Sequence, residues 1–149
     1  MSARTAILAA AAALGVLAIA LARSGGPSDR VRALEADPIA AYVPPGGRLV
    51  HTSSQNEGSA LGKPVFARYI RMFQLTGRSS KQSFAAARTK AKASGWIEVG
   101  EPDAHVFVAD KHAPSGRIEL GITLFEDPLL LPNDVKPPAL LISLRHNGP

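Results

Sequence analysis

The feature that most constrains this chain is an uninterrupted apolar run near its N-terminus. The run extends from Ala6 to Ala22, "AILAAAAALGVLAIALA", carries no charge, and follows a short leader, residues 1–4, that contains Arg4. A basic leader and an apolar run predict a membrane-inserting segment, which we place at residues 5–22. Its length of about 17 residues suits both a short spanning helix and a long signal segment, so a retained anchor and cleavage after Ala22 both stay open.

The charges around this run bear on its orientation. Arg23, Arg30 and Arg32 follow it, and the positive-inside rule counts them in favour of an inward-facing domain. A short basic leader followed directly by an apolar run is the layout of exported proteins, and we give it more weight. We therefore expect a single-pass protein of the cell membrane whose C-terminal domain lies outside the cytoplasm, with secretion after signal cleavage as the alternative.

Two clusters of breaker residues divide the rest of the chain, Ser24–Ser28, "SGGPS", and Pro44–Gly47, "PPGG". They predict a tether over residues 23–46, with a short helical turn near Val31–Leu34, and a small folded domain over residues 47–149. The chain contains no cysteine. Disulfides, thiolate metal sites and a cysteine nucleophile are therefore excluded.

The periodicity of the domain predicts an α+β fold. Alternation is clearest in "RIELGITLFE", where Ile118, Leu120, Ile122 and Leu124 share one face of a strand. Similar runs predict strands over residues 48–53, 65–75, 105–111, 117–126 and 139–146. A helix between the second and third strands gives the order β-β-α-β-β-β. We expect a two-layer domain in which this one helix packs on a mostly antiparallel sheet.

The helix has a signal at each end. Ser79 and Gln82 match a capping box at its start, and Gly95 supplies a left-handed cap at its end. We expect Trp96 to fold back onto the sheet beyond this cap. The face that should pack on the sheet contains Phe84, Ala87 and Ala91.

Two segments are expected to be loops, residues 56–64 and residues 127–138, because both are rich in turn-forming residues. The second loop contains the apolar stretch Leu129–Leu131. Such a stretch must either pack under the domain or contact a partner, and the sequence leaves both open.

Positive charge gathers in the middle of the chain, where no acidic residue occurs between Glu57 and Glu98. At about 100° per residue, Lys81, Arg88 and Lys92 fall on one stripe of the expected helix. The stripe predicts docking to an anionic partner, which could be anionic lipid, a wall polymer or an acidic protein. The alternative is a solvated face, with other arginines of the region pairing to acidic strands inside the domain. Nucleic acid is not an expected partner, because no recognition motif accompanies the charge.

Catalytic and metal-binding patterns are weak. The pairs Asp103-x-His105 and Asp110-x-His112 could supply oxygen and nitrogen ligands, but in an extended strand they lie roughly 20 Å apart and cannot share one ion. The common hydrolase, nucleotide-binding and zinc-protease motifs are absent from the sequence. We therefore expect a non-catalytic interaction domain without a metal or another cofactor. A small hydrolase or metal-dependent enzyme is the less favoured alternative.

Overall fold

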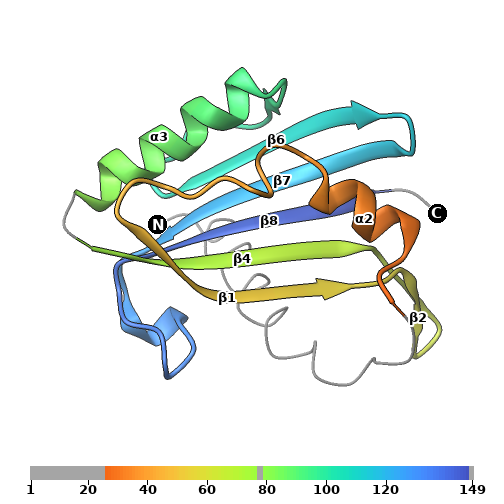
Figure 1. Cartoon of the computed structure of the whole chain (residues 1–149), viewed down its shortest axis with the longest axis horizontal. Helices are drawn as coiled ribbons and strands as arrows, with labels where there is room; N and C mark the ends of the chain where they lie inside the picture. Colours follow the sequence, from red (N-terminus) through yellow and green to blue (C-terminus); the bar gives the residue numbers. More distant parts are fainter. Residues whose placement is uncertain (1–25, 77–78, 148–149) are drawn as a thin grey trace.

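The alternating strands build one six-stranded sheet, which carries its helices on one face (Figure 1). The computed structural model describes residues 26–76 and 79–147. The spatial order of the strands is β1 (Gly47–Gln55), β4 (Arg68–Leu75), β8 (Ala139–Asn147), β7 (Gly116–Phe125), β6 (Val106–Ala113) and β5 (Ile97–Glu98). Every neighbouring pair is antiparallel. The expected α+β class with a mostly antiparallel sheet is therefore confirmed.

The main core lies between the sheet and the helices. In β7 the residues expected to face inward are almost completely buried, with exposed fractions of 4% or less at Ile118, Leu120, Ile122 and Leu124. Their neighbours in β8 alternate in the same way, and Leu140, Ile142 and Leu144 join the same cluster. Because β8 lies in the middle of the sheet, Leu141 on its other face is buried as well.

Helix α3 (Ser80–Ala93) packs on this core through the predicted face, since Phe84, Ala87 and Ala91 are buried. Its end is a Schellman motif, in which the amides of Gly95 and Trp96 donate to the carbonyls of Lys92 and Ala91. Gly95 has φ +85°, and Trp96 is 3% exposed, as expected. The predicted capping box is wrong in one respect, because the side chain of the N-cap residue Ser79 makes no cap hydrogen bond.

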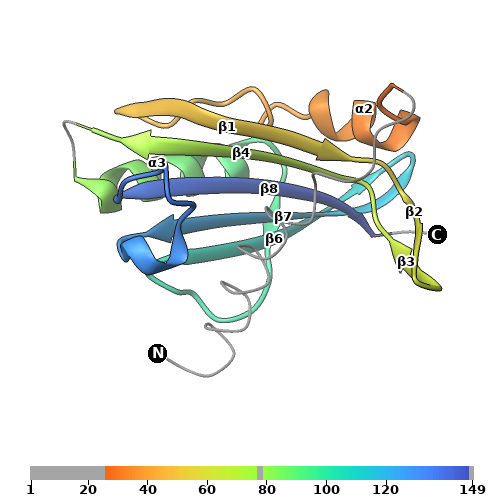
Figure 2. The same ribbon diagram turned by 90° about the horizontal axis from the view of Figure 1, so that it is seen from below.

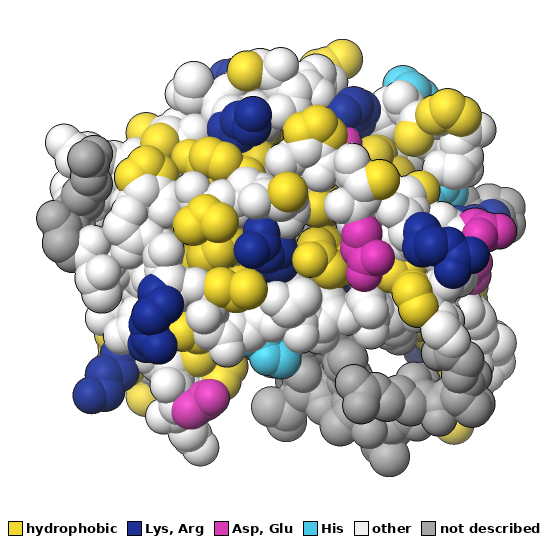
Figure 3. Space-filling view, viewed as in Figure 1, with side chains coloured by type: hydrophobic (Ala, Val, Ile, Leu, Met, Phe, Trp, Pro, Cys, Tyr) yellow, Lys and Arg dark blue, Asp and Glu magenta, His cyan; other side chains and the backbone are white. Residues whose placement is uncertain are grey.

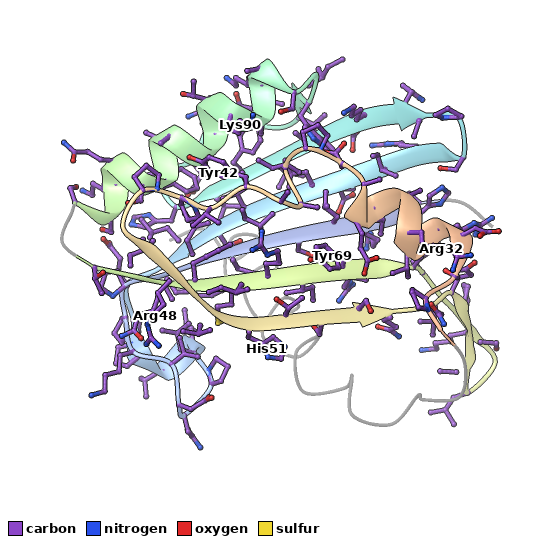
Figure 4. All side chains as sticks on the ribbon, viewed as in Figure 1. Arg32, Tyr42, Arg48, His51, Tyr69 and Lys90 are labelled. Atoms are coloured by element: carbon purple, nitrogen blue, oxygen red, sulfur yellow. The ribbon has the colours of Figure 1, made fainter. Side chains whose placement is uncertain are left out.

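The expected tether belongs largely to the folded domain. Residues 29–35 form a second helix, α2 (Asp29–Glu35), where a single turn was expected, and it packs against β4 and β8. Residues 36–46 then cross the helical side of the sheet, with Tyr42 packed against the core (Figure 4). Four apolar residues of the segment are 2% exposed or less: Val31, Leu34, Ile39 and Ala40. The domain therefore begins near residue 28 and not near Gly47, because these residues fill the core beside α3.

A buried carboxylate fixes this segment in place. Asp37 accepts hydrogen bonds from Lys111 Nζ at 2.9 Å and from Trp96 Nε1 at 3.2 Å. Lys111 also donates to the carbonyl of Ser94 at 2.9 Å. The side chain of Asp37 is only 5% exposed, so its charge is compensated within the domain.

The expected loop over residues 56–64 contains a hairpin, β2 (Gly58–Ala60) and β3 (Lys63–Val65). Its pairing continues the register of the β1–β4 ribbon, so the hairpin is the projecting end of that ribbon. Leu61 and Gly62 form its two-residue turn, and both have positive φ.

The second expected loop covers part of the other face of the sheet. It holds a short 3₁₀ helix, η2 (Pro128–Leu130). Figure 2 shows that η2 and the β2–β3 hairpin lie at opposite ends of the molecule. Leu131 and Val135 are buried against Phe125 and Leu141, whereas Leu129 is 89% exposed. The apolar stretch of this loop therefore divides between packing and exposure.

The predicted membrane segment, residues 5–22, lies outside the described residues. Within the described part of the chain, no helix combines the length and hydropathy that a bilayer-spanning helix needs.

Candidate anion-binding surface on helix α3

Two of the three predicted stripe residues meet at one carboxylate. Arg88 Nη2 lies 2.5 Å from Glu98 Oε1, and Lys92 Nζ lies 2.7 Å from Glu98 Oε2. Glu98 belongs to β5 and points to the helical side of the sheet, because it pairs with the buried Ala109 of β6. The hydrogen bonds from Arg88 and then Lys92 hold the pKa of Glu98 below its ordinary value. The trio therefore keeps one net positive charge at neutral pH.

The third stripe residue, Lys81, lies at the other end of α3, near Glu126. Ser80 Oγ donates to this carboxylate at 2.8 Å, and His105 Nε2 lies 3.0 Å from it. The hydrogen bond from Ser80, then that from His105, lowers the pKa of Glu126, and the charge of Lys81 contributes less. The stripe is therefore two separate, partly balanced groups. On the face shown in Figure 3, Lys and Arg side chains are scattered and form no continuous basic patch.

A hollow lies beside the Arg88 end of the helix. Its volume is about 390 Å³, and its lining includes Phe84, Ala85, Thr89 and Lys92 from α3 together with Asp103 from the following loop. Arg88 lines it too, and Arg88 Nε is buried without a hydrogen-bond partner among the described residues. The guanidinium also lies over the Phe107 ring, 5.7 Å from its centre. The hollow thus combines an apolar wall with two cationic side chains and one unused donor.

Asp103 also lines the hollow, and its carboxylate and that of Glu98 formally balance the charges of Arg88 and Lys92. Asp103 Oδ1 accepts hydrogen bonds from the amides of His105 at 2.7 Å and Val106 at 3.0 Å. The bonds order the loop ahead of β6. The exposed donors at the hollow are the Lys92 ammonium and the Thr89 hydroxyl, whereas Arg88 Nε is buried. A charged donor beside a hydroxyl suits a carboxylate or phosphate group.

Side chains of the Asp-x-His pairs contact other partners. Asp103 binds backbone amides and His105 contacts Glu126, while Asp110 pairs with Arg117 at the other end of β6. Within residues 26–76 and 79–147, no group of three or more metal-ligating side chains comes together. The two pairs therefore stay apart, as their spacing along the strand predicts.

Another arginine of the basic region has a structural partner. Arg71 donates to the carbonyls of Ala40 at 2.6 Å and Tyr42 at 3.1 Å, and it lies over the Phe73 ring. It therefore holds the segment between α2 and β1, and its hydrogen-bond partners are backbone carbonyls, whereas the alternative interpretation of the basic region had paired such arginines with acidic strands.

Sequence reasoning missed Glu98 as the group that organises the site. A signal for it exists, because Glu98 is the first acidic residue after the basic region and follows the Schellman motif by three residues. A chain that reverses direction at Gly95 returns along α3, which brings Glu98 beside Arg88 and Lys92.

Comparisons of the chain with protein-family models, with curated proteins and with solved structures each find no match. The functional argument therefore rests on the residues of this chain.

Proposed function

We propose that this chain is a membrane-anchored, extracytoplasmic domain that binds an acidic group of an envelope component in the hollow beside α3 and catalyses no reaction. The observation that carries the proposal is the pairing of Arg88 and Lys92 around one hollow with an apolar wall. The Phe107 ring lies against the Arg88 guanidinium before any ligand arrives, while Glu98 competes with the ligand for Arg88 and Lys92. Less side-chain entropy is then lost on binding than with a freely moving arginine.

The unused donor at Arg88 supports the same reading. A buried N–H group without an acceptor is unfavourable, and a carboxylate or phosphate oxygen would satisfy it once the Arg88 guanidinium turns toward the hollow. A hydrogen bond from a guanidinium to an ionised oxygen is stronger than one between neutral groups. Binding to a charged oxygen therefore suits Arg88 better than binding to a neutral ligand.

The binding proposal is tested on the full-length protein in detergent, by measuring its retention on polyglutamate-coated beads. Glu98→Gln frees Arg88 and Lys92 from their partner and should raise the affinity about fivefold, which corresponds to about 1 kcal/mol for one exposed charge pair. The double variant Arg88→Gln/Lys92→Gln should lower the affinity. The Glu98 variant carries the test, provided that its urea denaturation curve matches that of the wild type.

Lys90→Gln is the matched control, because Lys90 is an exposed lysine of the same helix that does not line the hollow. If this control, which removes one charge, reduces the free energy of binding by half as much as the double variant, which removes two, retention reports only the net charge of the protein, and the site is wrong.

The anchoring proposal is tested separately by cell fractionation, intact-mass analysis and external protease treatment of the expressed chain. A full-length, membrane-bound, protease-sensitive protein supports an anchored outward domain. A soluble chain that begins near Arg23 supports secretion, and a protected full-length chain places the domain in the cytoplasm.

A further inference from the structure

The β2–β3 hairpin carries the most exposed large apolar side chain among the described residues. Leu61, at its tip, is 103% exposed, and no described side chain shields it. The hairpin continues the β1–β4 ribbon past the ends of these two strands and projects from the main sheet (Figure 2). Leu61 therefore projects away from the body of the domain.

The backbone at this tip is unfavourable for leucine. Leu61 has φ 51° and Gly62 has φ 74°, the positive values of a turn that favours asparagine, aspartate or glycine at its first position. A side chain with Cβ is strained there, and an exposed leucine gains nothing from the core. Neither stability nor solubility accounts for Leu61, whereas contact with an apolar partner would.

The position of the hairpin identifies that partner. Asn56 Oδ1 accepts from the Ser28 amide at 2.8 Å, and Asn56 Nδ2 donates to the Gly26 carbonyl at 3.2 Å. Ser28 Oγ donates to Glu57 Oε2 at 2.6 Å. The first described residues are thus fixed to the base of the hairpin. Three residues separate Gly26 from Ala22, the end of the apolar run, and the four steps between these two residues span at most about 14 Å.

The charge of the hairpin suits a lipid surface. Residues 58–65 contain Lys63 and no acidic residue. Lys63 is exposed, two positions from Leu61. An apolar tip beside a cation matches the boundary between acyl chains and phosphate headgroups.

We propose that the β2–β3 hairpin docks on the bilayer that residues 6–22 enter, with Leu61 at the acyl boundary and Lys63 against lipid phosphate. This inference rests on the anchoring part of the proposed function. In this orientation the long axis of the domain points away from the bilayer, with the hairpin at the membrane and η2 at the remote end. The three residues that link Ala22 to Gly26 keep the hairpin close to the headgroup region. A weak contact is therefore enough to hold this orientation.

The absence of cysteine from the chain allows a direct test. Full-length Leu61→Cys and Leu129→Cys variants each receive one environment-sensitive nitrobenzoxadiazole label and are reconstituted into phosphatidylcholine–phosphatidylglycerol vesicles. Both positions are highly exposed leucines at opposite ends of the domain, so neither substitution disturbs the core. Docking predicts a blue shift, and quenching by lipids brominated near the headgroup, for the label at position 61 and neither effect at position 129.

Lys63→Gln, introduced beside the label at position 61, should lower the ratio of docked to undocked protein about fivefold in anionic vesicles, which corresponds to about 1 kcal/mol per lysine near such a surface. No change on this substitution would remove lysine–phosphate contact from the proposal.

The outcomes separate the two proposals. Retention in the vesicles with both labels in water overturns docking and leaves the anchor intact. Quenching of both labels overturns the end-on orientation. A protein that is not retained in the vesicles overturns the anchor, and docking with it.

Discussion

Two connecting segments cover parts of the two faces of the sheet, and different kinds of contact hold them in place. Residues 26–46 cover part of the helical face and are fixed by directional polar contacts as well as by apolar packing, above all at Asp37. Residues 127–138 cover part of the other face, where Leu131 and Val135 pack on the sheet.

The difference follows from sequence distance. The second segment connects β7 to β8, which are neighbours in the sheet. Both of its ends are therefore fixed by the sheet, and Leu131 reaches its packing position without a contact to a distant part of the chain. The first segment must find Trp96 and Lys111, which lie 59 and 74 residues away from Asp37 along the chain. Apolar contacts alone specify position weakly, whereas hydrogen bonds to one carboxylate specify it closely.

Loss of the Asp37 carboxylate should have the largest effect. Asp37→Ala leaves Lys111 without its ionic partner and Trp96 Nε1 without its acceptor, and we expect the free energy of unfolding to fall by about 3 kcal/mol. Urea denaturation monitored by Trp96 fluorescence measures this change. Adding Lys111→Met should recover part of the loss, because it removes the uncompensated charge. If the double variant is no more stable than Asp37→Ala, the ionic contact is not what holds the segment.

Truncation in the other segment should cost less. Leu131→Ala removes a buried side chain that packs on the sheet, and we expect a loss of about 2 kcal/mol in the free energy of unfolding. Leu129→Ala is the matched control and should change stability by less than about 0.5 kcal/mol, because that side chain is exposed. Equal effects of the two substitutions would show that the loop does not pack as described.

The same contrast explains how far the sequence predicts this fold. Strands β7 and β8 and the end of α3 could be predicted, because periodicity and the Gly95 cap are local signals that tertiary contacts reinforce. The segment before Gly47 was read as a tether, since its breaker residues are local while its contacts at Asp37 and Arg71 are distant. Pairing of Arg88 and Lys92 with Glu98 was missed for the same reason. A helical stripe can be read from spacing, but the carboxylate that balances it comes from β5.

Substitution of a buried histidine should increase the stability of the domain. His146 is 1% exposed, and neither ring nitrogen has a hydrogen-bond partner among the described residues. It lies in β8, one of the strands that α2 packs against, and its ring packs so closely on Gly116 that a Cβ there would lie 3.2 Å from Cε1. Because an unsatisfied buried polar group is unfavourable, His146→Leu should raise the free energy of unfolding by about 1 kcal/mol, measured by urea denaturation at pH 7. A loss of similar size would mean that the imidazole makes a stabilising contact.

The smallest expected effect is a pH dependence at the base of the hairpin. The hydrogen bond from Ser28 lowers the pKa of Glu57, and burial opposes it to a lesser degree. A carboxylate with a lowered folded-state pKa adds stability above its unfolded-state pKa of about 4.3, and this stability is lost as pH falls through the folded value. We expect amide exchange in α2 to become faster in acid, by a free energy of a few tenths of a kcal/mol for so exposed a contact.

Glu98 and Glu126 also have lowered pKa values and titrate with the same sign, so the acid response of the whole domain does not isolate Glu57. The difference between the wild-type protein and Glu57→Gln does, because the glutamine keeps an acceptor for Ser28 and cannot titrate. Hydrogen exchange at Val31 and Arg32, compared between pH 6 and pH 4, should depend on pH more strongly in the wild type after correction for the intrinsic exchange rate. Exchange at Leu131 should show no such difference between the two proteins, because its segment is held by apolar contacts. An equal difference at both places would mean that Glu57 acts on the whole domain and not on the segment beside the hairpin.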